Sequence, residues 1–195
     1  MKTGILLTAG TVLFLAASGC VVVDHERAPQ SWPKPISASD VKQFDGVFSN
    51  RSVDPKTGQP GDQSAQLFDF LTGRGHSFGK LGLEVEIRSA SDGSLLHVRL
   101  LDEQELEIVS ADLHRGADFE LSRGFLSLHG PFSGTHAIST NLGTGIRHQS
   151  FQLYISSTSD LLGRQSDSGA GLLFYSVPIV TDTKDCMLWP KIVSK

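Results

Sequence analysis

The 195-residue chain has little cysteine, only Cys20 and Cys186. Two cysteines cannot supply a framework of disulfides, so the fold must depend on its apolar core. Cys186 follows Asp185, and an acidic neighbour disfavours the thiolate. We therefore expect Cys186 to be a buried small apolar side chain, with a reactive or intermolecular thiol as the alternative.

An excess of basic residues is also lacking. The chain has 17 Lys and Arg against 21 Asp and Glu, a net charge of −4, and both signs are scattered along it. Residues 1–19 contain Lys2 and no acidic residue, so without them the balance is 16 against 21, or −5. This composition gives no basic surface for nucleic acid, and we expect no nucleic-acid partner.

Motifs for hydrolysis are weak. The one Gly-x-Ser-x-Gly sequence, Gly75-His76-Ser77-Phe78-Gly79, lies in a glycine-rich turn after the short helix expected over 67–71, whereas a nucleophile elbow follows a strand. Ser127 and His129 lie two residues apart, with Asp112 and His114 in a neighbouring segment, but ordinary strand alternation explains all four. We predict no catalytic residue, while a hydrolase whose site is assembled from distant residues stays an alternative.

Signatures of cofactor and metal sites are likewise missing. The glycine-rich segment Gly73–Lys80 lacks the spacing of a phosphate loop, and Leu81 replaces the hydroxyl residue that such loops need. No two of the seven histidines have the tight spacing of a zinc site. We therefore predict no cofactor and no metal.

The amino-terminal segment is the most informative part of the chain. Lys2 is followed by an apolar stretch, Ile5–Leu15, and then by small residues that end at Cys20. This is the layout of a secretory signal peptide. The run Leu15-Ala16-Ala17-Ser18-Gly19-Cys20 resembles the lipobox of bacterial lipoproteins, although Ala17 occupies a position where leucine is commonest.

The resemblance implies cleavage between Gly19 and Cys20, attachment of diacylglycerol to the Cys20 thiol and acylation of the new amino terminus, commonly with palmitate. Two or more acyl chains hold a protein stably on a membrane. In such lipoproteins aspartate after the cysteine favours the inner membrane, so Val21 implies an outer-membrane anchor on the periplasmic side. The alternative is an uncleaved transmembrane helix, because Gly4–Val23 is uncharged over 20 residues.

Residues 20–43 are predicted to form a lipidated, proline-rich linker, and residues 44–195 a single domain. Pro29, Pro33 and Pro35 favour an extended path. The 176 residues after the signal peptide suffice for one domain. Ser39 or Asp40 is expected to cap a short helical turn over 41–44, and Asp62 or Ser64 a short helix over 67–71 that ends at Gly73.

From Leu83 onward apolar and polar residues alternate, which predicts half-buried strands. Asp92-Gly93 is a strong hairpin signal between strands 83–88 and 95–101. Segments 131–147 and 161–169 are rich in small polar residues, and we interpret them as mobile loops. Glu84 and Glu86 are expected on the solvent face, where they serve solubility. Further strands are predicted at 105–111, 119–122, 124–128, 150–156, 171–180 and 187–193, and inward-pointing phenylalanines at 48, 68, 70, 119, 125, 151 and 174.

These strands predict an all-β antiparallel meander. We expect a closed or half-open, lipocalin-like barrel, because closure removes the exposed edge strands of a sheet. The aromatic-glycine-aromatic-asparagine pattern in 44–52 resembles the first strand of small calycin-like or barrel-like envelope lipoproteins. Together with the anchor, this predicts a non-catalytic interaction module for an envelope protein. The alternative is a carrier of a lipid-like or other apolar ligand.

Overall fold

The structure is a computed structural model, and it describes residues 20–25, 28–53, 57–60, 65–73, 82–129, 133–140, 143–174 and 177–193. The predicted signal peptide, including Gly19, lies outside these ranges, as do Asp62, Ser64 and the glycine-rich segment 74–80. Strands make up most of the described residues, as predicted. None of the helices in these ranges has the length and apolar character needed to cross a membrane.

The described strands form two sheets. In the larger sheet the order is β1-β12-β11-β10-β8-β7, and β2 and β9 also pair with β10. In the smaller sheet the order is β3-β4-β5-β6, an antiparallel meander. The bounds are β1 Cys20–His25, β2 Pro35–Ile36, β3 Gly46–Ser49, β4 Glu84–Ser89, β5 Leu95–Leu101, β6 Glu107–His114, β7 Phe119–Ser122, β8 Phe125–Leu128, β9 Gly134–Thr140, β10 Gly143–Ser156, β11 Leu161–Leu173 and β12 Val177–Trp189.

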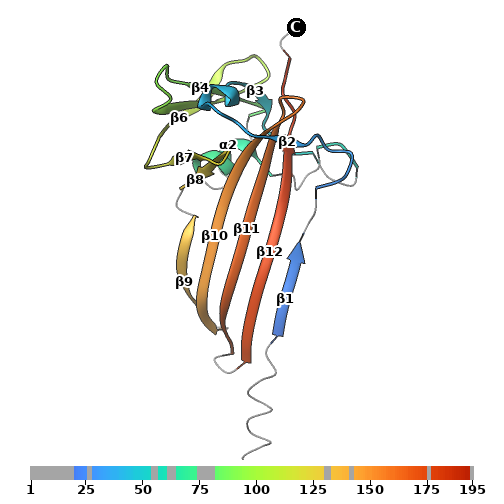
Figure 1. Ribbon diagram of the computed structural model, residues 1–195, viewed down its shortest axis with the longest axis vertical. Helices are drawn as coiled ribbons and strands as arrows, with labels where there is room; N and C mark the ends of the chain where they lie inside the picture. The colour runs from blue at the N-terminus through green and yellow to red at the C-terminus, as the bar shows by residue number, and fades with distance from the viewer. Residues whose placement is uncertain are drawn as a thin grey trace, which may run out of the picture.

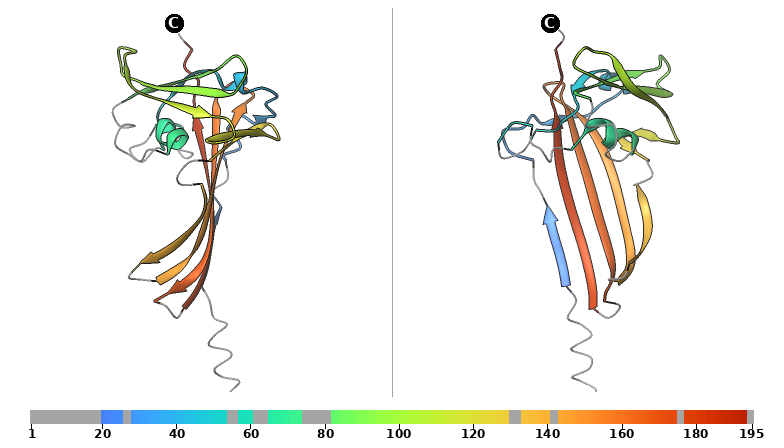
Figure 2. Two further views of the ribbon diagram at one scale, coloured as in Figure 1. Left: turned by 90° about the vertical axis from the view of Figure 1, so that its left-hand side faces the viewer. Right: turned by 180° about the vertical axis from the view of Figure 1, so that it is seen from behind.

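The three long strands β10, β11 and β12 give the molecule an elongated shape (Figure 1). One half of each strand packs in a wide head together with the smaller sheet, and the other half projects from it as a curved single layer (Figure 2). We call this projection the blade. It consists of β1, β9 and residues 143–149, 167–173 and 177–183 of the long strands.

The core lies in the head, between the inner faces of the two sheets. Val85, Ile87 and Val98 come from the smaller sheet, and Leu153 and Trp189 come from the larger one. The Trp189 ring is fully buried, and its Nε1 donates a hydrogen bond to the carbonyl oxygen of Ala65 (3.1 Å). Burial of these side chains is the main stabilising contribution to the head.

A fully buried asparagine joins one short helix to the smaller sheet. Asn50 follows β3, and its Oδ1 accepts a hydrogen bond from the backbone N–H of Phe68 (3.1 Å) in helix α2, Leu67–Thr72. Its Nδ2 donates to the carbonyl oxygen of Gly82 (3.0 Å). The helix was expected to be capped by a residue just before it, but Gln66 occupies the N-cap position without a side-chain bond. The cap therefore comes from the distant Asn50.

Other local predictions are confirmed. Val41–Phe44 is a 3-10 helix, η1, with Asp40 as its N-cap and Gln43 completing a capping box. Helix α2 ends at Gly73, which has a left-handed conformation with φ of 63°. In the β4–β5 hairpin Gly93 has φ of 69°, and Asp92 Oδ1 accepts a hydrogen bond from the N–H of Ser94 (3.0 Å).

The predicted barrel is not confirmed. Among the described strands, β1 and β7 end the larger sheet and β3 and β6 end the smaller one, without pairing to close a cylinder. One junction does link the sheets, because Ser49 N–H donates to Pro190 O (2.9 Å) and Ile192 N–H donates to Val47 O (2.8 Å). The apolar faces are covered by packing sheet on sheet, which buries them without closure.

The two predicted loops are wrong. Segment 131–147 contains β9 and the start of β10, and segment 161–169 lies within β11. Most of 131–147 and the end of 161–169 lie in the blade, which is a single layer (Figure 2), so no core there requires alternating apolar residues. The strands are instead held by backbone pairing along β10–β11 and β11–β12. The start of the predicted linker, Cys20–His25, is also a strand, paired in parallel with β12.

Candidate functional site

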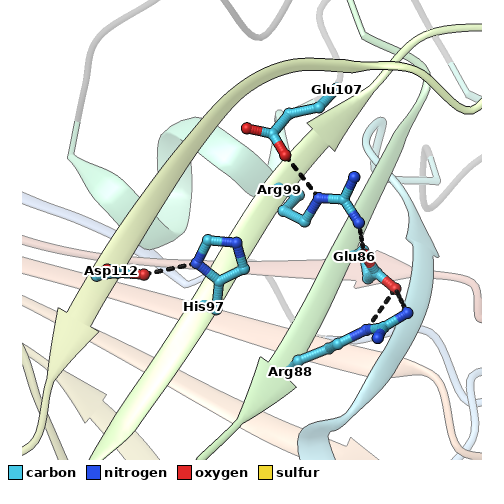
Figure 3. Close-up of polar contacts among 6 residues, drawn as sticks. All are labelled: Glu86, Arg88, His97, Arg99, Glu107 and Asp112. Carbon is cyan, nitrogen blue, oxygen red and sulfur yellow. Dashed lines mark hydrogen bonds and ion pairs between the residues drawn. The ribbon is translucent and has the colours of Figure 1, made fainter.

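The outer face of the smaller sheet carries an ordered set of charged and polar side chains (Figure 3). Neighbouring strands place Glu86 of β4 beside Arg99 of β5, whose Nη1 donates to Glu86 Oε2 at 2.7 Å. Arg99 Nε donates to Glu107 Oε2 of β6 at 2.8 Å, and Arg88 Nε donates to Glu86 Oε1 at 2.7 Å. We call the whole set the charged face; it comprises Glu86, Arg88, His97, Arg99, Glu107 and Asp112.

Glu86 corrects an expectation from the sequence. Strand alternation placed it on the solvent face for solubility, and it does point away from the core, but only 7% of the residue is exposed. Two arginines cover it, and both form ion pairs with its carboxylate. A carboxylate this buried needs such partners. Glu84, the other carboxylate of the predicted solvent pair, is half-buried, and burial raises its pKa, with a further contribution from Glu105.

Hydrogen bonds on the charged face also shift the pKa values of two of its side chains, Glu107 and Arg99. A hydrogen bond from Ser110 lowers the pKa of Glu107 most, and the bond from Arg99 lowers it further. The Glu107 hydrogen bond in turn raises the pKa of Arg99. Both groups are therefore held in their charged forms. Because the Glu107 side chain is 40% exposed, this arrangement orders the surface more than it stabilises the fold.

His97 lies on the same face and is partly exposed. Its Nδ1 is 2.6 Å from Asp112 Oδ1, with side-chain exposures of 41% and 52%. The other side chains drawn on this face are arginines and glutamates (Figure 3). Arg88 is the most exposed member, with 70% of its side chain accessible.

A second feature is an apolar groove of about 450 Å³ on the outer face of the larger sheet. One wall is the segment 28–35, which includes Trp32, and the floor includes Tyr154 of β10 and Leu162 of β11. The Tyr154 hydroxyl donates to Gln152 Oε1 (2.7 Å), and its ring packs on Phe125 with centroids 5.1 Å apart. Burial raises the pKa of Tyr154, so its hydroxyl is neutral.

The rim of the groove carries two cations, Arg164 of β11 and Lys184 of β12. Lys184 Nζ lies 3.7 Å from Asp182 Oδ2, whereas Arg164 is exposed. Cys186 pairs with Arg164 across the strands and also lines the groove. It is half-exposed, so the expectation that it is buried in the core is wrong.

The structure separates the residues considered for catalysis. Ser127 of β8 lies opposite Glu120 and Gln152 in the larger sheet. Asp112 belongs to β6 of the smaller sheet, opposite His97. Within the described part of the chain, no group of three or more histidine, cysteine, aspartate or glutamate side chains is arranged to hold a metal ion.

Cys20, the predicted lipidation residue, begins β1 opposite Ile179 of β12. The groove was not predicted, because it forms between segments more than 100 residues apart; Trp32 in the proline-rich stretch was the only local signal. Comparisons with models of protein families, with curated proteins and with solved structures found no match.

Proposed function

We propose that the protein is an envelope lipoprotein, held in the outer membrane on the periplasmic side by acylated Cys20, and that it acts as a non-catalytic interaction module for another envelope protein. The Leu15–Cys20 motif supports the anchor. The charged face supports the interaction, because its side chains are ordered before any partner arrives. Preorganised side chains lose less conformational entropy on binding.

The exposed charges of the charged face indicate which charges a partner protein must carry. Arg88 is 70% exposed and Asp112 has half of its side chain exposed, so these two are accessible at separate positions of the sheet. A complementary protein surface carries a carboxylate opposite Arg88 and a basic group opposite Asp112. Paired charges of this kind determine specificity and association rate more than affinity.

Chemical cross-linking in intact envelopes followed by affinity purification tests this proposal. Wild type and the variant Arg88→Glu are compared, with Arg123→Glu as a control for the same charge change in the β7–β8 turn of the other sheet. We expect one partner to be recovered with wild type and with Arg123→Glu, and to be reduced at least fivefold with Arg88→Glu. Equal recovery with all three proteins would contradict the role of the charged face.

The apolar groove favours a second candidate function, carriage of an amphipathic anionic ligand. Its volume falls within the range of about 300–1,000 Å³ that is usual for small-molecule sites. The apolar floor suits an acyl chain, while Arg164 and Lys184 suit a carboxylate at one end. Dodecanoate is a suitable probe, and we expect saturable binding that changes the fluorescence of Trp32 and weakens in the double variant Arg164→Glu, Lys184→Glu. Unsaturable binding, or equal binding of dodecanol, would refute this candidate.

A further inference from the structure

The free end of the blade combines three observations that point to a lipid surface. It carries several exposed apolar side chains, its strand residues carry no charge, and the predicted anchor begins there. We call this end the tip; it consists of residues 143–146, 168–174 and 177–181 of the long strands, with the first residues of β1 beside them. The tip lies at the end of the molecule opposite to the carboxyl terminus (Figure 1).

The exposed apolar side chains of the tip share one face of the sheet. Ile146 of β10, Ala170 of β11 and Val180 of β12 lie in one cross-strand row, and Leu172 follows two residues nearer the end. Side chains two residues apart on a strand point to the same face. The exposed fractions are 60% for Ile146, 47% for Val180, 40% for Leu172 and 61% for Phe174.

Phe174 has a backbone conformation that is unusual for a phenylalanine. It follows β11 directly, at the end of the blade, and has φ of 50°. This left-handed conformation is rare for a bulky residue and common for glycine or asparagine. The prediction of an inward-pointing Phe174 is wrong, since the ring is exposed beyond the last strand pair.

Charges stop at the same level on every long strand. The last charged residues before the tip are Arg147 on β10, Asp167 on β11 and Asp182 on β12. They lie in adjacent cross-strand rows, and Arg147 Nε donates to Asp167 Oδ1 at 2.8 Å. Beyond this boundary neither 130–146 nor 168–181 contains Asp, Glu, Lys or Arg.

The register of β1 places the predicted anchor beside the tip. Cys20 pairs with Ile179, and Asp24, the first charged residue after Cys20, pairs with Thr183 near the charge boundary. Cys20, the predicted anchor residue, thus lies at the uncharged end of the blade. We propose that the tip is a membrane-docking surface that inserts into the headgroup and upper acyl region of the bilayer holding the anchor.

The tip is too short to span a bilayer, and only its end would enter the interface. Residues 168–173 of β11 extend roughly 20 Å at about 3.4 Å per residue. A spanning strand needs about 9–11 residues, whereas interfacial elements enter by about 5–10 Å. Insertion is also limited by the edge strands β1 and β9, because their outward backbone groups need water or headgroups as hydrogen-bond partners.

This inference rests on the proposed amino-terminal anchoring, but it has its own test. The complete mature protein, purified from membranes, is reconstituted into phosphatidylethanolamine and phosphatidylglycerol vesicles that contain lipids brominated on their acyl chains. Two variants in a Trp32→Phe background report position, each measured as the difference from the same background without the added tryptophan, which retains buried Trp189: Phe174→Trp at the tip and Leu106→Trp in the head. The two residues are matched in exposure, at 61% and 64%.

We expect the brominated lipid to quench the Phe174→Trp variant at least threefold more than the Leu106→Trp variant, with a blue-shifted emission in the former only. Equal quenching in a protein whose Cys20 is acylated would overturn the docking surface and leave the anchor intact. Strong quenching in a protein with unmodified Cys20 would support docking while refuting acylation. A blue shift without quenching, in a protein that sediments as a dimer, would assign the tip to a second copy and overturn the proposal.

Discussion

Removal of the Asn50 side chain tests whether the head depends on this one buried amide. Asn50→Ala eliminates the hydrogen bond from the Phe68 N–H and the bond to the Gly82 carbonyl oxygen, and both of these backbone groups are buried. A buried polar group left without a partner costs about 1–3 kcal/mol. We therefore expect the free energy of unfolding to fall by about 2–4 kcal/mol, which lowers the melting temperature by roughly 5–15 °C.

The measurement is urea unfolding of the chain from residue 20 onward, with Cys20→Ser, followed by circular dichroism. Thr57→Ala is the control, because it removes a side-chain hydrogen bond at an exposed position and should change the unfolding free energy by less than about 0.5 kcal/mol. If Asn50→Ala loses no more stability than the control, the amide does not hold helix α2 against the sheet, and this part of our reasoning is refuted.

Three further results are expected. Gly163→Ala places a methyl group against the buried Trp189 ring and should destabilise the head by about 1–3 kcal/mol in the same urea assay; an unchanged midpoint would show that the ring can move aside. The pKa of Glu107 is lowered, so its stabilising contribution is present above the unfolded pKa and is lost as pH falls through the folded pKa; Ser110→Ala should raise the Glu107 pKa in an NMR titration, and an unaltered titration would exclude that hydrogen bond. Burial raises the pKa of Glu84, so its contribution is present below the unfolded pKa and lost as pH rises through the folded pKa; Glu84→Gln should increase stability at pH 7 more than at pH 3, and an equal effect at both would contradict this.

Elements with local chemistry could be predicted from the sequence. The β4–β5 hairpin depends on Asp92-Gly93, and the η1 turn depends on the capping box of Asp40 and Gln43, all of which are adjacent in the chain. The end of α2 depends on Gly73 in the same way. Such features need no information about the rest of the fold.

The blade could not be predicted in this way. Its three long strands have 13 or 14 residues, but residues 143–149 and 167–171 are rich in glycine and polar residues, which do not mark a strand. The predicted strand 171–180 instead spans the end of β11 and the start of β12, and Phe174, which follows β11, has a positive φ. Neither phenylalanine nor its neighbours are residues that normally mark a turn.

The candidate sites depend on contacts between distant residues. Glu86 was expected in solvent because its burial requires Arg99, which only the pairing of β4 with β5 brings beside it. The groove requires Trp32 to pack near Leu162, and no period in the sequence connects those two positions. Residue types predicted the charged and apolar faces of individual strands, whereas tertiary structure decided which side chains meet.

The central claim is that Cys20 anchors the protein to a membrane at the tip of the blade. Mass spectrometry of the amino-terminal peptide, from protein extracted out of membranes, tests it most directly. Our account predicts a peptide that begins at Cys20 and carries a diacylglyceryl group with a further acyl chain. A peptide that retains residues before Cys20, or one that begins there with an unmodified thiol, would contradict it.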